Sequence, residues 1–184
     1  RAITQLRTLL ISDPDLIGNT DGIPVVDRDE ANRASLGRDL EYLLGRQACG
    51  ESLDASELRW LDNARSLNST IASAGELDLL TIAYQPSAYG GDGIAVVSYG
   101  NPDSAEHTSI LVPGIMQSGQ TISHNSGMSR TLHMSAIANE SSVATITWIG
   151  YDSPNWNPSG ELLDYPGSLL DAAHTLSEVN AEQG

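Results

Sequence analysis

Two segments of the 184-residue sequence combine turn residues with groups that can bind a substrate. In the first, residues 110–120 (Ile-Leu-Val-Pro-Gly-Ile-Met-Gln-Ser-Gly-Gln), an apolar run passes through Pro-Gly into small and polar residues. Gly114 permits a turn that lets main-chain N–H groups face outward, and a helix that follows would add its positive N-terminal end. Because such a loop suits a developing negative oxygen, we expect its main chain to bind a substrate.

The second segment, residues 150–164, also follows an apolar run and contains prolines, aromatic residues and hydrogen-bonding side chains. In an open α/β sheet, ligands gather at the carboxyl ends of parallel strands, so the two loops are expected to lie side by side. We expect a pocket lined by Gln117, Ser118, Tyr151 and Asp152. The alternative is an ordinary turn whose aromatic side chains pack inward.

Other catalytic chemistries fit the sequence less well. A triad of Ser118 with His124 or His133 lacks the Gly-x-Ser-x-Gly turn, which occurs nowhere in the chain, so Ser118 is interpreted as a loop or capping serine. The single cysteine, Cys49, cannot form an internal disulfide and is expected in a loop between helices, with no catalytic role. The histidines lack metal-ligand spacing and no glycine-rich phosphate motif is present, so no metal and no cofactor are expected.

Charge and hydropathy exclude two classes of partner. The net charge is -15, and residues 77–184 carry Arg130 alone against eleven acids, so this half would repel nucleic acid. No apolar run approaches the roughly 18 residues that span a bilayer. We therefore expect a soluble protein, cytoplasmic or secreted. The chain begins without Met and ends without a polar tail, which suggests a piece of a longer protein.

The first 76 residues are predicted to form a helical segment. A charged helix with one apolar stripe is expected from Val25 through Leu44, and Asp54 with Glu57 forms the N-terminal signature of a second helix that stops at Gly75. A shorter helix is predicted over residues 3–11. Residues 16–24 mix turn residues with aliphatic ones and are interpreted as an ordered connection, with a lid edge as the alternative.

From residue 77 the apolar pattern indicates strands. Four are predicted, with the third and fourth apolar enough to be covered on both faces: residues 77–84, 94–99, 108–112 and 143–149. The first two are expected to form an antiparallel hairpin. A helix over residues 120–139 should connect the last two as a parallel pair with a right-handed crossover. A final helix is predicted over residues 168–180.

Three pieces of sequence carry a family resemblance: "LIGNTDGIPVVDRDEANRASL" at 16–36, "GIAVVSYGNPDSAEHTSILVPG" at 93–114 and "TWIGYDSP" at 147–154. They are similar to the predicted α/β-hydrolases, common in high-GC Gram-positive bacteria, that were long catalogued as a domain of unknown function. The resemblance implies a serine hydrolase fold whose third strand ends at Val112. It also implies that the loop after this strand supplies one oxyanion N–H, from Ile115 or Met116.

The sequence therefore predicts an α/β fold in which a helical segment, residues 1–76, precedes the first half of an α/β-hydrolase-type sheet, residues 77–184. The expected function is that of the N-terminal part of a serine hydrolase acting on an ester or related acyl substrate. The resemblance places the catalytic serine, acid and histidine beyond Gly184, so a downstream segment or a second chain should complete the sheet. The alternative is a truncated, non-catalytic hydrolase-like module that binds a partner.

Overall fold

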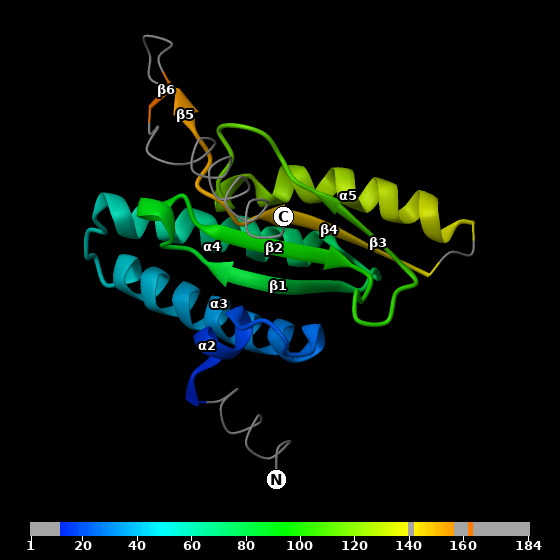
Figure 1. Cartoon of the computed structure of the whole chain (residues 1–184). Coiled ribbons are helices and arrows are strands. Elements are labelled where there is room, and N and C mark those ends of the chain that lie inside the picture. The colour runs from blue at the N-terminus through cyan, green and yellow to red at the C-terminus, as the bar shows by residue number, and fades with distance from the viewer. Residues whose placement is uncertain (1–11, 140–141, 157–161, 164–184) are drawn as a thin grey trace, which may run out of the picture.

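The computed structural model describes residues 12–139, 142–156 and 162–163. It places a mixed sheet against α-helices and two short 3-10 helices (Figure 1). The helices are α2 (Pro14–Asn19), α3 (Val25–Ala48), α4 (Ala55–Ser73), η1 (Tyr89–Gly91), η2 (Gly119–Thr121) and α5 (Ile122–Ile137). The strands are β1 (Leu79–Gln85), β2 (Ile94–Tyr99), β3 (His107–Leu111), β4 (Val143–Ile149), β5 (Asn155–Trp156) and β6 (Leu162–Leu163). No helix among these residues is long and apolar enough to span a membrane.

The two long helices confirm the predicted helical segment. Helix α4 begins at the predicted capping box, in which Asp54 accepts main-chain N–H groups and Glu57 bonds back to the Asp54 amide. The predicted stripes are buried at Ala31, Leu36, Leu43, Leu61, Ala64 and Leu67. Asp39 of α3 is buried, and its carboxylate accepts hydrogen bonds from Trp60 and Tyr84.

The main sheet has the strand order β1-β2-β4-β3. Strands β1 and β2 pair antiparallel, as the predicted hairpin requires, with a register shift between Thr81 and Ala83. Strand β2 is also antiparallel to β4, while β3 and β4 form the predicted parallel pair through α5. The α/β fold class and the mixed sheet are therefore confirmed. Strands β1, β3 and β4 run in the same direction, so their carboxyl ends lie at the same end of the sheet.

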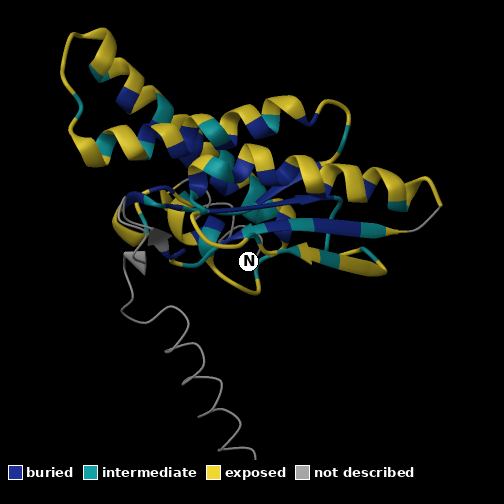
Figure 2. Ribbon diagram, turned by 90° about the horizontal axis from the view of Figure 1, so that it is seen from above, coloured by how far each residue is buried: buried dark blue, intermediate teal, exposed yellow. Residues whose placement is uncertain are grey.

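One face of the sheet packs against the helices. Side chains from α3, α4 and α5 share a single core with the sheet: Leu36, Ala64, Leu67, Ala74, Leu79, Tyr84, Ala95, Val97, Tyr99, Ile122 and Ile149. Figure 2 shows these helices together on one side of the strands, with buried positions where the two layers meet. Because the helical segment and the sheet share this core, the division at residue 76 stays a prediction.

The outer edge of β1 is closed by side chains in place of another strand. Asp29 accepts the Thr81 N–H at 2.7 Å, and Arg33 donates to the Leu79 carbonyl at 2.7 Å. Asn32 donates to the Thr81 carbonyl at 3.0 Å, and Asn19 both donates to and accepts from the main chain of Tyr84. This β1 seal satisfies groups that an exposed edge would leave available for pairing.

Strand β3 differs from its prediction. It was expected to be covered on both faces, but its five residues are exposed or half-buried, and Ile110 is 61% exposed. The physical reason is its position, since β3 pairs only with β4 and forms the other edge of the described sheet. Strand β3 and the residue after it therefore expose Ile110 and Val112 at an edge that pairs with no other described strand.

The connection predicted over residues 16–24 is also partly wrong. Residues Pro14–Asn19 form helix α2, whose N-cap is Asp13, and the Asp13 carboxylate accepts the Leu16 N–H. Asp at the N-cap followed by Pro at the first helical position is a helix-start signal. The predicted helices at 3–11 and 168–180 lie outside the described residues.

Candidate functional site

The loops after β3 and β4 meet at the carboxyl end of the parallel pair. The Tyr151 hydroxyl lies 2.7 Å from the Pro113 carbonyl oxygen and 2.5 Å from that of Gly114. The Ser153 hydroxyl, which is buried, accepts the Gln117 N–H at 3.0 Å. These contacts join positions 36 to 38 residues apart in sequence, so each loop fixes the other.

The turn of the first loop is strained at Met116. Its φ of 59° lies in the left-handed region, which costs a residue with a Cβ roughly 1–2 kcal/mol. The Met116 N–H donates to the Pro154 carbonyl at 3.0 Å, and this bond helps to hold the unusual conformation. Strain of this kind concentrates where the surrounding structure supports a binding or catalytic conformation.

The two predicted oxyanion donors differ in whether the main-chain N–H already donates a hydrogen bond. The Met116 N–H is engaged by Pro154, whereas the Ile115 N–H donates no hydrogen bond to any described residue. The side chains of Ile115 and Met116 are 46% and 54% exposed, so this loop presents apolar groups beside an available main-chain donor. The first turn of α5, which follows the loop, contains no acidic residue that would repel an anion.

The residues predicted to line a pocket occupy different positions within the joined loops. The Gln117 side chain is half-buried, donating to the Ile115 carbonyl at 3.2 Å and accepting from Asn125 at 2.8 Å. Ser118 precedes η2, where its N–H donates to Thr121 Oγ1 at 3.3 Å. The Tyr151 ring stacks on Trp148 with centroids 5.9 Å apart, and Asp152 is exposed.

The segment between β1 and β2 contacts both loops. The Gly119 N–H donates to the Asp92 carbonyl at 2.6 Å, and the Tyr89 hydroxyl donates to the Gly150 carbonyl at 3.3 Å. Buried Asn63 of α4 donates to the carbonyls of Pro86 and Gly91, at 2.7 and 2.9 Å. Helix α4 thereby positions the segment that contacts the loop after β3.

His133 lies away from a catalytic arrangement with Ser118. His133 is buried under α5, stacked on Tyr99 with ring centroids 6.0 Å apart, and burial lowers the pKa of its imidazole. It lies eleven residues beyond Ile122, which places it about 16 Å along the helix from the loops. Within the described ranges, no group of three or more His, Cys, Asp or Glu side chains is placed to hold a metal ion.

Sequence reasoning missed two residues that shape this site. Ser153 was part of a quoted motif without an assigned role, and Asn63 was a polar position on a helix that was expected to pack by its apolar stripe. A buried Asn or Ser among apolar positions is a signal, because such a group requires a partner. The partners themselves come from tertiary structure.

Comparisons with known proteins bear on the family of this chain. A family model described as alpha/beta hydrolase matches residues 90–181, half of the chain, beginning just before β2 and covering both loops. No solved structure gives a significant match.

Two curated relatives from Mycobacterium tuberculosis are each 32% identical over 175 residues, which cover 82% of this chain and 26% of the relative. They are the uncharacterized protein MT2140 of strain CDC 1551 / Oshkosh and the uncharacterized protein Rv2079 of strain ATCC 25618 / H37Rv. The chain therefore spans about a quarter of the length of the curated relatives it matches.

Proposed function

The chain belongs to the alpha/beta hydrolase family, and from this premise we propose that it forms the oxyanion-binding side of a serine hydrolase acting on an ester or related acyl substrate. In the proposal the catalytic serine lies in sequence beyond Gly184 and follows a strand that adds to β3. This chain alone is inactive in the proposal, because it supplies the scaffold and one donor but not the nucleophile.

The observation that carries the proposal is the unengaged N–H of Ile115. It lies next to a strained residue in a loop that is fixed by Tyr151 and Ser153, at the carboxyl end of the parallel strands. Main-chain donors fixed in advance of the reaction need little reorganisation when charge develops, which makes them effective in acyl transfer. The exposed apolar side chains of Ile115 and Met116 fit a surface that the remaining sheet covers.

The chemistry follows from this donor. A serine hydroxyl gives its proton to a base as its oxygen bonds to the acyl carbon, and the carbonyl electron pair moves onto oxygen. The Ile115 N–H donates to that oxyanion until the alcohol or amine leaves with a proton. Water then repeats the attack and releases the acid and the serine.

The partner of the β3 edge is a further strand, supplied by a downstream segment or by a second chain. The two edges of the sheet favour this arrangement, since β1 is sealed by Asn19, Asp29, Asn32 and Arg33 while β3 exposes Ile110. This difference between the two edges supports the addition of a further strand next to β3.

The test uses the whole protein that contains this chain. Ile115→Pro deletes the N–H, and Ile115→Ala removes the side chain but keeps the donor, so the pair separates the two contributions. We expect Ile115→Pro to lower kcat on a p-nitrophenyl ester by about a hundredfold or more, and Ile115→Ala to lower it by less than about tenfold. Met116→Pro would be a poor probe because proline cannot adopt a φ of 59°.

Labelling with a fluorophosphonate provides an independent readout. The whole protein should be labelled on one serine, and Ile115→Pro should keep its thermal unfolding midpoint within a few degrees of the unmodified protein. If the whole protein neither hydrolyses p-nitrophenyl esters nor reacts with the fluorophosphonate, serine hydrolysis is wrong and a binding role replaces it. If Ile115→Pro and Ile115→Ala have equal kcat, the oxyanion assignment fails.

A further inference from the structure

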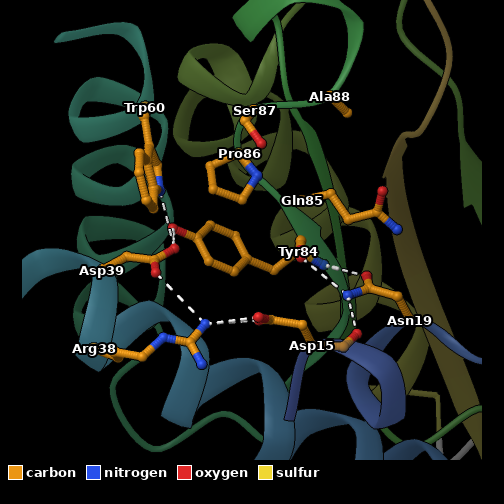
Figure 3. Close-up of a pocket in the computed structure, with 10 residues that line it drawn as sticks. All are labelled: Asp15, Asn19, Arg38, Asp39, Trp60, Tyr84, Gln85, Pro86, Ser87 and Ala88. Carbon is orange, nitrogen blue, oxygen red and sulfur yellow. Dashed lines mark hydrogen bonds and ion pairs between the residues drawn. The ribbon is translucent and has the colours of Figure 1, made fainter. Parts of the chain in front are cut away.

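A pocket of about 590 Å³ lies between the helical segment and the end of β1 (Figure 3). Its volume is within the usual range for small-molecule sites, which often form where two structural units meet. The lining comes from α2, α3, α4, β1 and the segment after β1: Asp15, Asn19, Arg38, Asp39, Trp60, Tyr84, Gln85, Pro86, Ser87 and Ala88. The proposed hydrolase chemistry uses none of these side chains.

The Asp39 carboxylate is a buried charged group in the lining of this α3–β1 pocket. Its Oδ2 accepts two hydrogen bonds, from Trp60 Nε1 and from the Tyr84 hydroxyl, each at 3.0 Å. Its Oδ1 has Arg38 Nη2 as its closest described charged neighbour, at 3.7 Å, which exceeds a hydrogen-bond distance. One oxygen of a buried carboxylate therefore retains capacity to accept a proton donor. Burial raises the pKa of Asp39, which agrees with this incomplete compensation.

Arg38 supplies donors next to this oxygen. Its Nη2 is held by both oxygens of Asp15, at 2.8 and 2.9 Å, while its Nε and Nη1 donate to no described residue. The guanidinium is half-exposed, and Figure 3 shows it extending from α3 between Asp15 and Asp39. The pocket thus places an available acceptor and available donors side by side, with charges of opposite sign.

These charges favour a neutral ligand. A cation that reached Asp39 Oδ1 would lie close to the Arg38 guanidinium, and an anion that reached Arg38 would lie close to Asp15 and Asp39. A hydroxyl group meets both needs, because it donates to the carboxylate and accepts from the guanidinium. The amide of Gln85 and the hydroxyl of Ser87, both exposed, add further partners for hydroxyl groups at the rim.

The aromatic residues complete the recognition surface. Trp60 and Tyr84 flank Asp39 in Figure 3, and Pro86 lies beside the Tyr84 ring. The half-buried Trp60 ring offers apolar area to a ligand, whereas the Tyr84 ring is buried and belongs to the core. The polar group of each ring bonds Asp39. We propose that the α3–β1 pocket binds a neutral carbohydrate, with hydroxyl groups on Asp39 Oδ1 and Arg38 and a sugar ring against the half-buried ring of Trp60.

This site is separate from the loop site. Strands β1 and β3 are three inter-strand spacings apart, or about 14 Å. The segment that follows the pocket, through η1, contacts the loop site at Gly119 and Gly150. Because the pocket shares no lining residue with the loop site, carbohydrate binding can be measured on the full chain without any activity.

The experiment is a titration of the ¹⁵N-labelled full chain with D-glucose, maltose and trehalose, followed by NMR. The readout is the Trp60 indole N–H, assigned by loss of its signal in Trp60→Phe. At least one neutral sugar should shift this signal saturably. Glucosamine and glucuronate, which carry a positive and a negative charge, should bind at least tenfold more weakly than the neutral sugar that binds best.

Two variants and their matched controls localise the binding. Ser87→Leu fills the rim and should raise the Kd at least tenfold, whereas Ser69→Leu, on an exposed position of α4, should leave it unchanged. Gln85→Ala removes an exposed amide without disturbing the fold and should raise the Kd about threefold, with Gln47→Ala as its control. The proposal is overturned if no neutral sugar shifts the signal, if a charged analogue binds as tightly, or if Ser87→Leu and Gln85→Ala both bind like their controls.

Discussion

The Ser153 hydroxyl offers a direct test of whether the two loops hold each other. Ser153→Ala removes the acceptor for the Gln117 N–H and the longer, 3.4 Å bond to the Gly114 carbonyl. An N–H left without a partner costs about 1–3 kcal/mol when buried, and Gln117 is only half-buried, so a loss of about 1–2 kcal/mol is expected. For a chain of this length that corresponds to a fall in Tm of roughly 2–8 °C.

The assay combines thermal unfolding of the full chain with amide hydrogen exchange at Gln117. Ser123→Ala is the matched control, because Ser123 is exposed on α5 and its hydroxyl bonds to no described residue. Exchange at Gln117 should accelerate in Ser153→Ala and stay unchanged in Ser123→Ala. Equal Tm values for the two variants, with Gln117 exchange unaltered, would refute the idea that the β4 loop fixes the β3 loop.

Three further changes test the surrounding scaffold by equilibrium unfolding. Gly18→Ala would place its Cβ 2.1 Å from Asn32 Oδ1 and should lower the free energy of unfolding by about 1–3 kcal/mol. Gly37→Ala, in open space on α3, should raise it by about 0.5–1 kcal/mol. Similar effects of the two substitutions would contradict this prediction. Asn63→Ala leaves two carbonyls without their donor and should cost about 2–4 kcal/mol, so a loss below 1 kcal/mol would argue against the Asn63 anchor. Because burial raises the pKa of Asp39, its stabilising contribution is complete below about pH 4 and is lost as the pH rises. Relative to Asp39→Asn, the unmodified chain should therefore lose stability from pH 4 to pH 7. The opposite trend would exclude a desolvated carboxylate at this position.

The strands were predictable because turn residues bound them closely. Gly93 and Gly100 flank β2, and Gly150 follows β4, so the observed bounds of both strands match the predicted ones. Helix α2 was missed because six residues give too little periodicity to compete with their turn-forming composition. The exposure of Ile110 was missed for a different reason, since an apolar strand has the same sequence at an edge as in the centre of a sheet.

The site was predictable at the level of its loops but not of its hydrogen bonds. Adjacent parallel strands bring the loops after β3 and β4 together in any such sheet, and the chain order alone implied this. The engagement of the Met116 N–H by Pro154 joins residues 38 positions apart, and no local pattern specifies it. The α3–β1 pocket could not be predicted from the sequence either, because Asp39 and Trp60 lie on different helices and Tyr84 lies on a strand.

The side chains that seal β1 limit how copies of this chain can associate. A sheet with two open edges can add strands at both ends and grow into an unlimited fibre. The four-stranded sheet described here has β3 as its one open edge, so two copies that paired through β3 would leave neither with a further edge to offer. Strand pairing would then stop at a closed two-fold dimer, which is a soluble end point and not the start of a polymer.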